Sequence, residues 1–126
     1  MSQPVTWLNA NGSVGLNVAE TPDYRRLPDL LADMDRLGVA RAVVWNKSAI
    51  PHAPGGNRRL LEAIRTTPAA AGRIIPALAI APTMLVERGA LDELLATVRQ
   101  EGIRALRALP KSLYYDLRHL EPLLEK

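Results

Sequence analysis

The feature of this sequence that most constrains its fold is a repeated alternation of short apolar runs with longer segments in which leucines recur every three or four residues. Apolar, β-prone runs lie near residues 5–9, 41–46, 73–80 and 103–109. Helical patterns lie near residues 28–37, 57–66 and 88–101, and a fourth helix starts near residue 122. This alternation favours right-handed βαβ crossovers and a parallel sheet. We therefore expect an α/β fold in which residues 1–126 form one domain of about four βα units.

Proline, glycine and asparagine mark the expected ends of these elements. Pro28 suits the first turn of a helix, and Gly38 suits the position just past its end. Asn57 has the side chain of a helix N-cap, and Gly102 ends the third helical pattern. Pro76 interrupts the third apolar run. Because proline removes a donor from the ladder, we expect it at a bulge or near the start of that strand.

The sequence stops soon after a helix begins. Pro122 suits a first helical turn, and only four residues follow it. A single helical turn does not persist by itself, and no stop signal follows this one. We therefore expect the chain to be a fragment of a longer protein or a natural truncation.

Composition argues against several classes of protein. There is no cysteine, so disulfides and thiolate metal sites are excluded. The net charge is +3, but the arginines are scattered and aromatic residues make up 4%, too few for a base-stacking platform, so no nucleic-acid partner is expected. No apolar run is long enough to span a membrane, and the N-terminus lacks a secretion signal. We therefore expect a cytoplasmic protein with no membrane partner.

Several short motifs occur in an order that resembles a known family. Leu8–Gly15 is similar to a motif that closes a first strand, and Met34–Val44 to a segment joining a first helix to a second strand. Gly56-Asn57 resembles the opening of a second helix, and Arg73–Leu78 and Gly102–Arg107 resemble third and fourth strands. Together they resemble the amidohydrolase-related family of metal-dependent hydrolases, which fold as TIM barrels. The resemblance implies the N-terminal half, about four βα units, of a (β/α)8 barrel with parallel strands.

The resemblance also implies a chemistry and shows where this chain departs from it. The parent reaction is metal-assisted hydrolysis, or a related decarboxylation, of a small carboxylate-type substrate, with a zinc-like divalent metal. The family's His-x-His ligands map onto Asn11 and Ser13, and its aspartate maps onto Asn9. Asn and Ser are weak ligands without carboxylates nearby, and the remaining family ligands come from strands five, six and eight. We expect no cofactor in this chain, and we expect the chain alone to be inactive. Turn chemistry explains Asn9, Asn11 and Ser13 as well.

A few other side chains are candidates for binding a ligand. Asn46, Lys47 and His52 follow the second predicted strand, at the end of a barrel where such folds carry out chemistry. Arg107 and Lys111 lie at the end of the fourth strand, where a carboxylate or phosphate could be held. Each of these residues also has a simpler interpretation as a solvated surface group.

Three hypotheses for function remain open. The first is the front half of an amidohydrolase-like hydrolase whose missing C-terminal half completes the barrel and whose substrate is a small molecule. The second is a non-catalytic half-barrel that self-associates, with two copies closing a barrel as a homodimer. The third is a small α/β ligand-binding module in which Asn46, Lys47 and His52 surround a ligand. A curled sheet favours the first two, and a flat twisted sheet favours the third.

Overall fold

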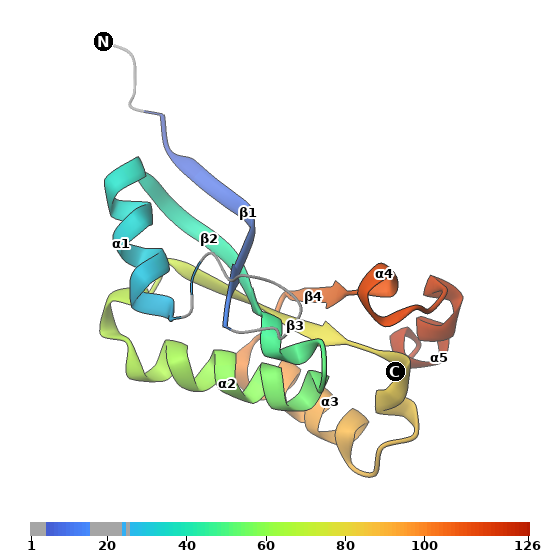
Figure 1. The fold of residues 1–126 in the computed structure, drawn as a ribbon. Helices are drawn as coiled ribbons and strands as arrows, with labels where there is room; N and C mark the ends of the chain where they lie inside the picture. The colour runs from blue at the N-terminus through green and yellow to red at the C-terminus, as the bar shows by residue number, and fades with distance from the viewer. Residues whose placement is uncertain (1–4, 16–23, 25) are drawn as a thin grey trace.

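The chain forms one parallel sheet with helices between successive strands. The computed structural model describes residues 5–15, 24 and 26–126. The four strands, β1 (Trp7–Val14), β2 (Val39–Asn46), β3 (Ile74–Ile80) and β4 (Ala105–Ala108), lie in the order β1-β2-β3-β4 and all pairs are parallel. The sheet curls into a half-barrel (Figure 1). The expected α/β fold with about four parallel strands is therefore confirmed.

Three longer helices connect these strands, and shorter ones follow them. The longer helices are α1 (Leu27–Leu37), α2 (Ala53–Thr66) and α3 (Ala90–Glu101). The short elements are η1 (Lys47–Ala49), η2 (Pro68–Ala70), η3 (Pro82–Leu85), α4 (Pro110–Leu113), η4 (Leu117–Leu120) and α5 (Glu121–Leu124). In Figure 1, α2 and α3 lie along one side of the sheet, and α4 and α5 lie beyond the end of β4. None of the helices in the described part of the chain is long and apolar enough to cross a membrane.

Among the described residues, the core consists of two clusters of buried apolar residues. One cluster joins the first two helices to the strands and contains Val14, Leu27, Leu30, Leu31, Met34, Ala42, Val44, Leu60, Ala70 and Ile74. Side chains alternate along a strand, so this cluster fixes which residues face the helices. Val14 and Val44 face the helices, whereas Ser13, Val43 and Trp45 lie on the opposite, concave side.

The start of α2 differs from the sequence prediction. The helix begins at Ala53 rather than at Asn57, and its N-cap is His52, whose side chain accepts a hydrogen bond from the N–H of Gly55. The sequence favoured a loop because prolines and glycines precede Asn57. A Cβ on Gly56 would lie 2.2 Å from the Ala49 backbone nitrogen, so glycine is needed here for close packing of α2 against η1.

The first strand also differs from its expected limits of residues 5–9. It runs to Val14, and its pairing with β2 is interrupted by a register shift between Asn9 and Gly12. An extra residue in one strand is a β-bulge, which changes the direction of the side chains that follow it. Asn11 and Ser13 therefore lie within a strand instead of in a turn after it.

Pro76 lies where the sheet changes partners. It is the third residue of β3, and its pairing with Val44 is the last between β2 and β3. Pairing of β3 with β4 begins at the next residue, Ala77. A proline is tolerated at this position because one ladder ends there and the other has not begun.

Candidate functional site

The concave face of the sheet carries a polar cluster made by Asn11, Trp45 and Arg107. Arg107 is on β4 beside Ala79 of β3, and its Nη1 donates a hydrogen bond of 2.5 Å to Oδ1 of Asn11 on β1. The same guanidinium lies over the ring of Trp45 on β2, 5.0 Å from the ring centroid. The cluster thus connects the two outer strands of the sheet across its concave side.

Two further candidate residues lie beside this cluster. Oδ1 of Asn9 accepts a hydrogen bond of 2.9 Å from the backbone N–H of Asn11, which supports the bulge in β1. Ser13 is half-buried and pairs in register with Trp45, so its side chain lies on the concave face. Of the sequence candidates, therefore, Asn9, Asn11, Ser13 and Arg107 lie close together.

Asn11 and Ser13, the positions where the sequence resemblance would put metal ligands, do not fit a divalent metal. Oδ1 of Asn11 accepts a hydrogen bond from a cation, and Ser13 offers only a neutral hydroxyl. Within residues 5–15, 24 and 26–126 there is also no group of three or more His, Cys, Asp or Glu side chains that could hold an ion. A divalent metal needs charged or imidazole ligands close together, and the described residues do not supply them.

The concave face carries positive charge and no acid. None of the four strands contains an aspartate or a glutamate. Arg41 lies on the same side of β2 as Val43 and Trp45, because side chains alternate along the strand. Arg107 forms no ion pair with any residue in the described part of the chain, unlike Arg58 and Arg73. An anion on this face would meet a fixed cation.

His52 lies apart from the cluster, and both of its ring nitrogens bond within the protein. Nδ1 accepts a hydrogen bond of 3.1 Å from the N–H of Gly55, so it carries no proton. Nε2 lies 2.7 Å from Oε1 of Glu87, to which it donates a hydrogen bond. This arrangement leaves neither nitrogen to ligate a metal or to accept a proton from a substrate.

A pocket lies next to His52 at the carboxyl ends of β3 and β4. Its volume is about 400 Å³, and its lining is mainly apolar, with Thr83, Glu87 and Tyr115 as polar groups. The Tyr115 hydroxyl accepts a hydrogen bond from the N–H of Leu109 and donates one to the carbonyl of Ile80. The polar groups of this pocket are largely engaged in holding its own walls together.

The remaining candidates are not brought to the concave cluster. Asn46 is buried on the helix side of the sheet, opposite Val14, and its Oδ1 accepts hydrogen bonds from the N–H and the hydroxyl of Ser48. Lys47 begins η1, and Lys111 is exposed in α4. Asn46 therefore stabilises the turn after β2, and its amide is not directed toward Arg107.

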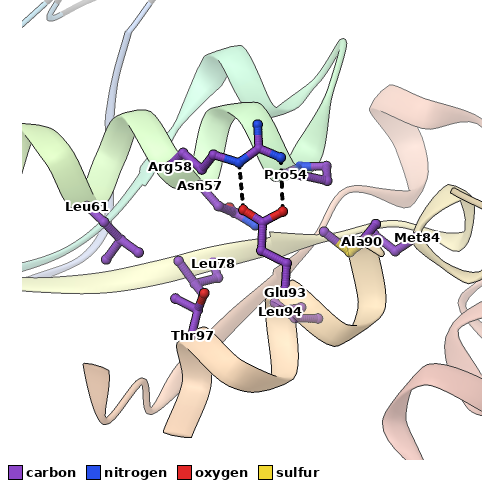
Figure 2. A pocket seen from close by; sticks show the side chains of 10 residues that line it. All are labelled: Pro54, Asn57, Arg58, Leu61, Leu78, Met84, Ala90, Glu93, Leu94 and Thr97. Carbon is purple, nitrogen blue, oxygen red and sulfur yellow. Dashed lines mark hydrogen bonds and ion pairs between the residues drawn. The ribbon is translucent and has the colours of Figure 1, made fainter. Parts of the chain in front are cut away.

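A second, much smaller cavity lies between α2, α3 and β3. Figure 2 shows Arg58 and Glu93 facing each other across it, joined by hydrogen bonds of 2.6 and 2.9 Å. This pairing lowers the pKa of the Glu93 carboxyl and raises the pKa of the Arg58 guanidinium. The cavity holds about 20 Å³, which is room for one water molecule, so we assign it to helix packing.

Comparison of the chain with protein-family models, with curated proteins and with solved structures found no match. The site is therefore defined by its own geometry. Sequence reasoning missed Trp45, the aromatic platform under Arg107, because it reads as one more apolar residue of a buried strand. Its signal is alternation along β2, which puts Trp45 on the face opposite Val44.

Proposed function

We propose that the chain is the amino-terminal half of a (β/α)8 barrel of the amidohydrolase-related type. The parent reaction is hydrolysis or decarboxylation of a small carboxylate-type substrate. The order of the sequence motifs supports this assignment, and so does a curled parallel sheet whose strands follow one another in chain order. In such barrels the substrate binds at the carboxyl ends of the strands, and Arg107 is the next-to-last residue of β4.

The observation that carries the proposal is the meeting of Arg107 and Asn11 on the concave face. These residues are 96 positions apart and come from the two outer strands, yet they share a hydrogen bond. A polar contact of this kind needs the sheet to curl. The cation lies near the carboxyl end of β4, and barrels of the proposed type bind their substrates at that end of the strands. Because Asn11 and Ser13 do not suit a metal, we assign no step to one, and we expect the isolated chain to be inactive.

Exposed apolar groups on the outer strands favour self-association as a second candidate. Trp7 and Leu8 on β1 are 62% and 55% exposed, and Leu106 on β4 is also exposed. Large exposed apolar surfaces promote association. A closed barrel of two copies, however, would bring two sets of Arg41 and Arg107 into one interior without an acid from any strand. The charge on the concave face thus favours the first candidate over a homodimer.

The curl of the sheet also disfavours the third candidate, a small ligand-binding module. Asn46 and His52, which that hypothesis places around a ligand, bond to Ser48 and to Gly55 and Glu87 instead. Their polar atoms therefore stabilise the turn after β2 and the start of α2.

The decisive experiment is to read the coding sequence beyond Lys126 and to measure the intact mass of the native protein. We expect the frame to continue through about four more βα units. A native mass of 13.8 kDa, that of the 126 residues alone, would refute the half-barrel enzyme and favour the self-associating protein. This measurement does not depend on which substrate the barrel binds.

A further inference from the structure

We propose that Arg107 is the fixed cation of a site for a small carboxylate on the concave face, and that this site works without a divalent metal. The inference deepens the proposed function and rests on it for the choice of a carboxylate. The site itself rests on the contacts of Arg107 with Asn11 and Trp45.

The guanidinium is held in place before any ligand arrives. Trp45 is 8% exposed, so its ring is a fixed platform, and Arg107 lies 5.0 Å above the ring centroid. The attraction between a guanidinium and an aromatic face orients the plane of the cation. Asn11 then fixes one end of it through the bond to Nη1. A cation that is already oriented loses little conformational entropy when an anion binds.

The guanidinium of Arg107 has N–H donors that can still bind a ligand. An arginine side chain has five N–H donors, and the described contacts of Arg107 use one of them, the bond to Asn11. Two parallel N–H groups match the two oxygens of a carboxylate, which makes such a pair both strong and directional. No carboxylate from the described part of the chain takes this place, and Arg41 adds positive charge to the same face.

The position of Asn11 beside the guanidinium opposes the binding of a metal there. Asn11 stands where the family places the first histidine of its His-x-His motif, and its amide oxygen faces the guanidinium. An oxygen that accepts a hydrogen bond from one cation is a poor ligand for a second, because the two positive charges repel each other. The fixed positive charge at this end of β1 is thus the guanidinium of Arg107.

The test is a titration of the ¹⁵N-labelled native protein with sodium glutarate in the presence of EDTA, followed by NMR. We expect saturable shifts of the Trp45 indole N–H and the Arg107 Nε–H signals, with no shift of the exposed Trp7 indole. Arg107→Met should weaken binding at least tenfold. Arg107→Lys, which keeps the charge but loses the paired donors, should weaken it as well. Arg104→Met is the matched control, because it removes an equal charge from an exposed residue just before β4.

Backbone spectra show whether each variant is folded. If Arg107→Met does not fold, Arg107→Lys still tests the site. The absence of a saturable shift in the wild type, or equal weakening by Arg104→Met, would overturn the proposal. Glutarate binding that appears only after zinc chloride replaces EDTA would overturn the metal-free site. Tighter binding of inorganic phosphate than of glutarate would overturn the assignment to a carboxylate. Arg107-dependent binding with a native mass of 13.8 kDa would refute the half-barrel enzyme and leave this site intact.

Discussion

Replacing Asn57 with alanine removes the side chain that holds the carboxyl end of β3. Asn57 is 8% exposed, and its amide forms two hydrogen bonds with Ala79. Its Oδ1 accepts the Ala79 N–H at 2.7 Å, and its Nδ2 donates to the Ala79 carbonyl at 2.9 Å. The ladder between β2 and β3 ends at Pro76, so beside Ala79 the amide of Asn57 takes the place of β2, while β4 pairs with Ala79 on the other side.

The size of the effect follows from the two backbone groups that lose their partner. Each buried group left without a hydrogen bond costs about 1–3 kcal/mol, so the change should lower the free energy of unfolding by about 2–6 kcal/mol. Water entering the space left by the amide would place the value near the lower end. Even a loss of about 2 kcal/mol is a sizeable fraction of the roughly 5–15 kcal/mol that stabilises a typical domain.

Equilibrium urea unfolding, followed by circular dichroism, measures the global cost, and hydrogen exchange of the Ala79 amide measures the local one. We expect Asn57→Ala to shift the urea midpoint and to remove the protection of the Ala79 amide. Arg59→Ala, an exposed change in the same helix, should alter stability by less than about 0.5 kcal/mol. A cost for Asn57→Ala as small as that of Arg59→Ala, with the Ala79 amide still protected, would refute the reasoning.

Two other changes test the packing of α2. Gly56→Ala stabilises a helix by about 0.5–1 kcal/mol where there is room. Here the new Cβ would meet the Ala49 backbone, so we expect a loss of roughly 1–3 kcal/mol in urea unfolding, and a gain would contradict the packing. Glu93→Gln tests the Arg58 pair through pH. Because the pairing lowers the pKa of Glu93 in the folded state, its contribution is present above the ordinary value of 4.5 and is lost as pH falls through the folded pKa. The wild type should therefore exceed Glu93→Gln in urea midpoint at pH 7, with the difference disappearing in acid; a constant difference would count against the pair.

The order of strands and helices could be predicted from the sequence, because hydrophobic periodicity reports local structure directly. The limits of α1 were nearly right, since Pro28 and Gly38 act within a turn of their own position. The start of α2 was missed because Gly56 reads as a turn residue. Its actual role is to let α2 approach η1, which is a tertiary contact that no local pattern reveals.

The candidate site could be predicted only in part. Arg107 and Asn11 were both singled out, but their contact depends on the curl of the sheet and on the bulge in β1. Neither feature is visible in a sequence whose Asn-Gly-Ser segment has low β-propensity. His52 looked available because a loop histidine is usually solvated. In the structure His52 accepts a hydrogen bond from the helix that it caps and donates another to Glu87, 35 residues away.

The charge on the concave face leads to a last prediction, on how the isolated chain self-associates. A closed barrel of two copies would bring two copies of Arg107 face to face, whereas pairing at the exposed edge of β1 would not. We therefore expect a weak association through the β1 edge that grows with concentration, measured by sedimentation velocity. Leu8→Lys should suppress it, because a charge on an edge strand opposes further pairing. Val86→Lys, a charge added at a residue that is 86% exposed and outside the strands, should leave it unchanged. A dimer that persists at every concentration and ignores Leu8→Lys would mean that two copies do close a barrel, and that an anion or another group offsets the charge of Arg107 inside it.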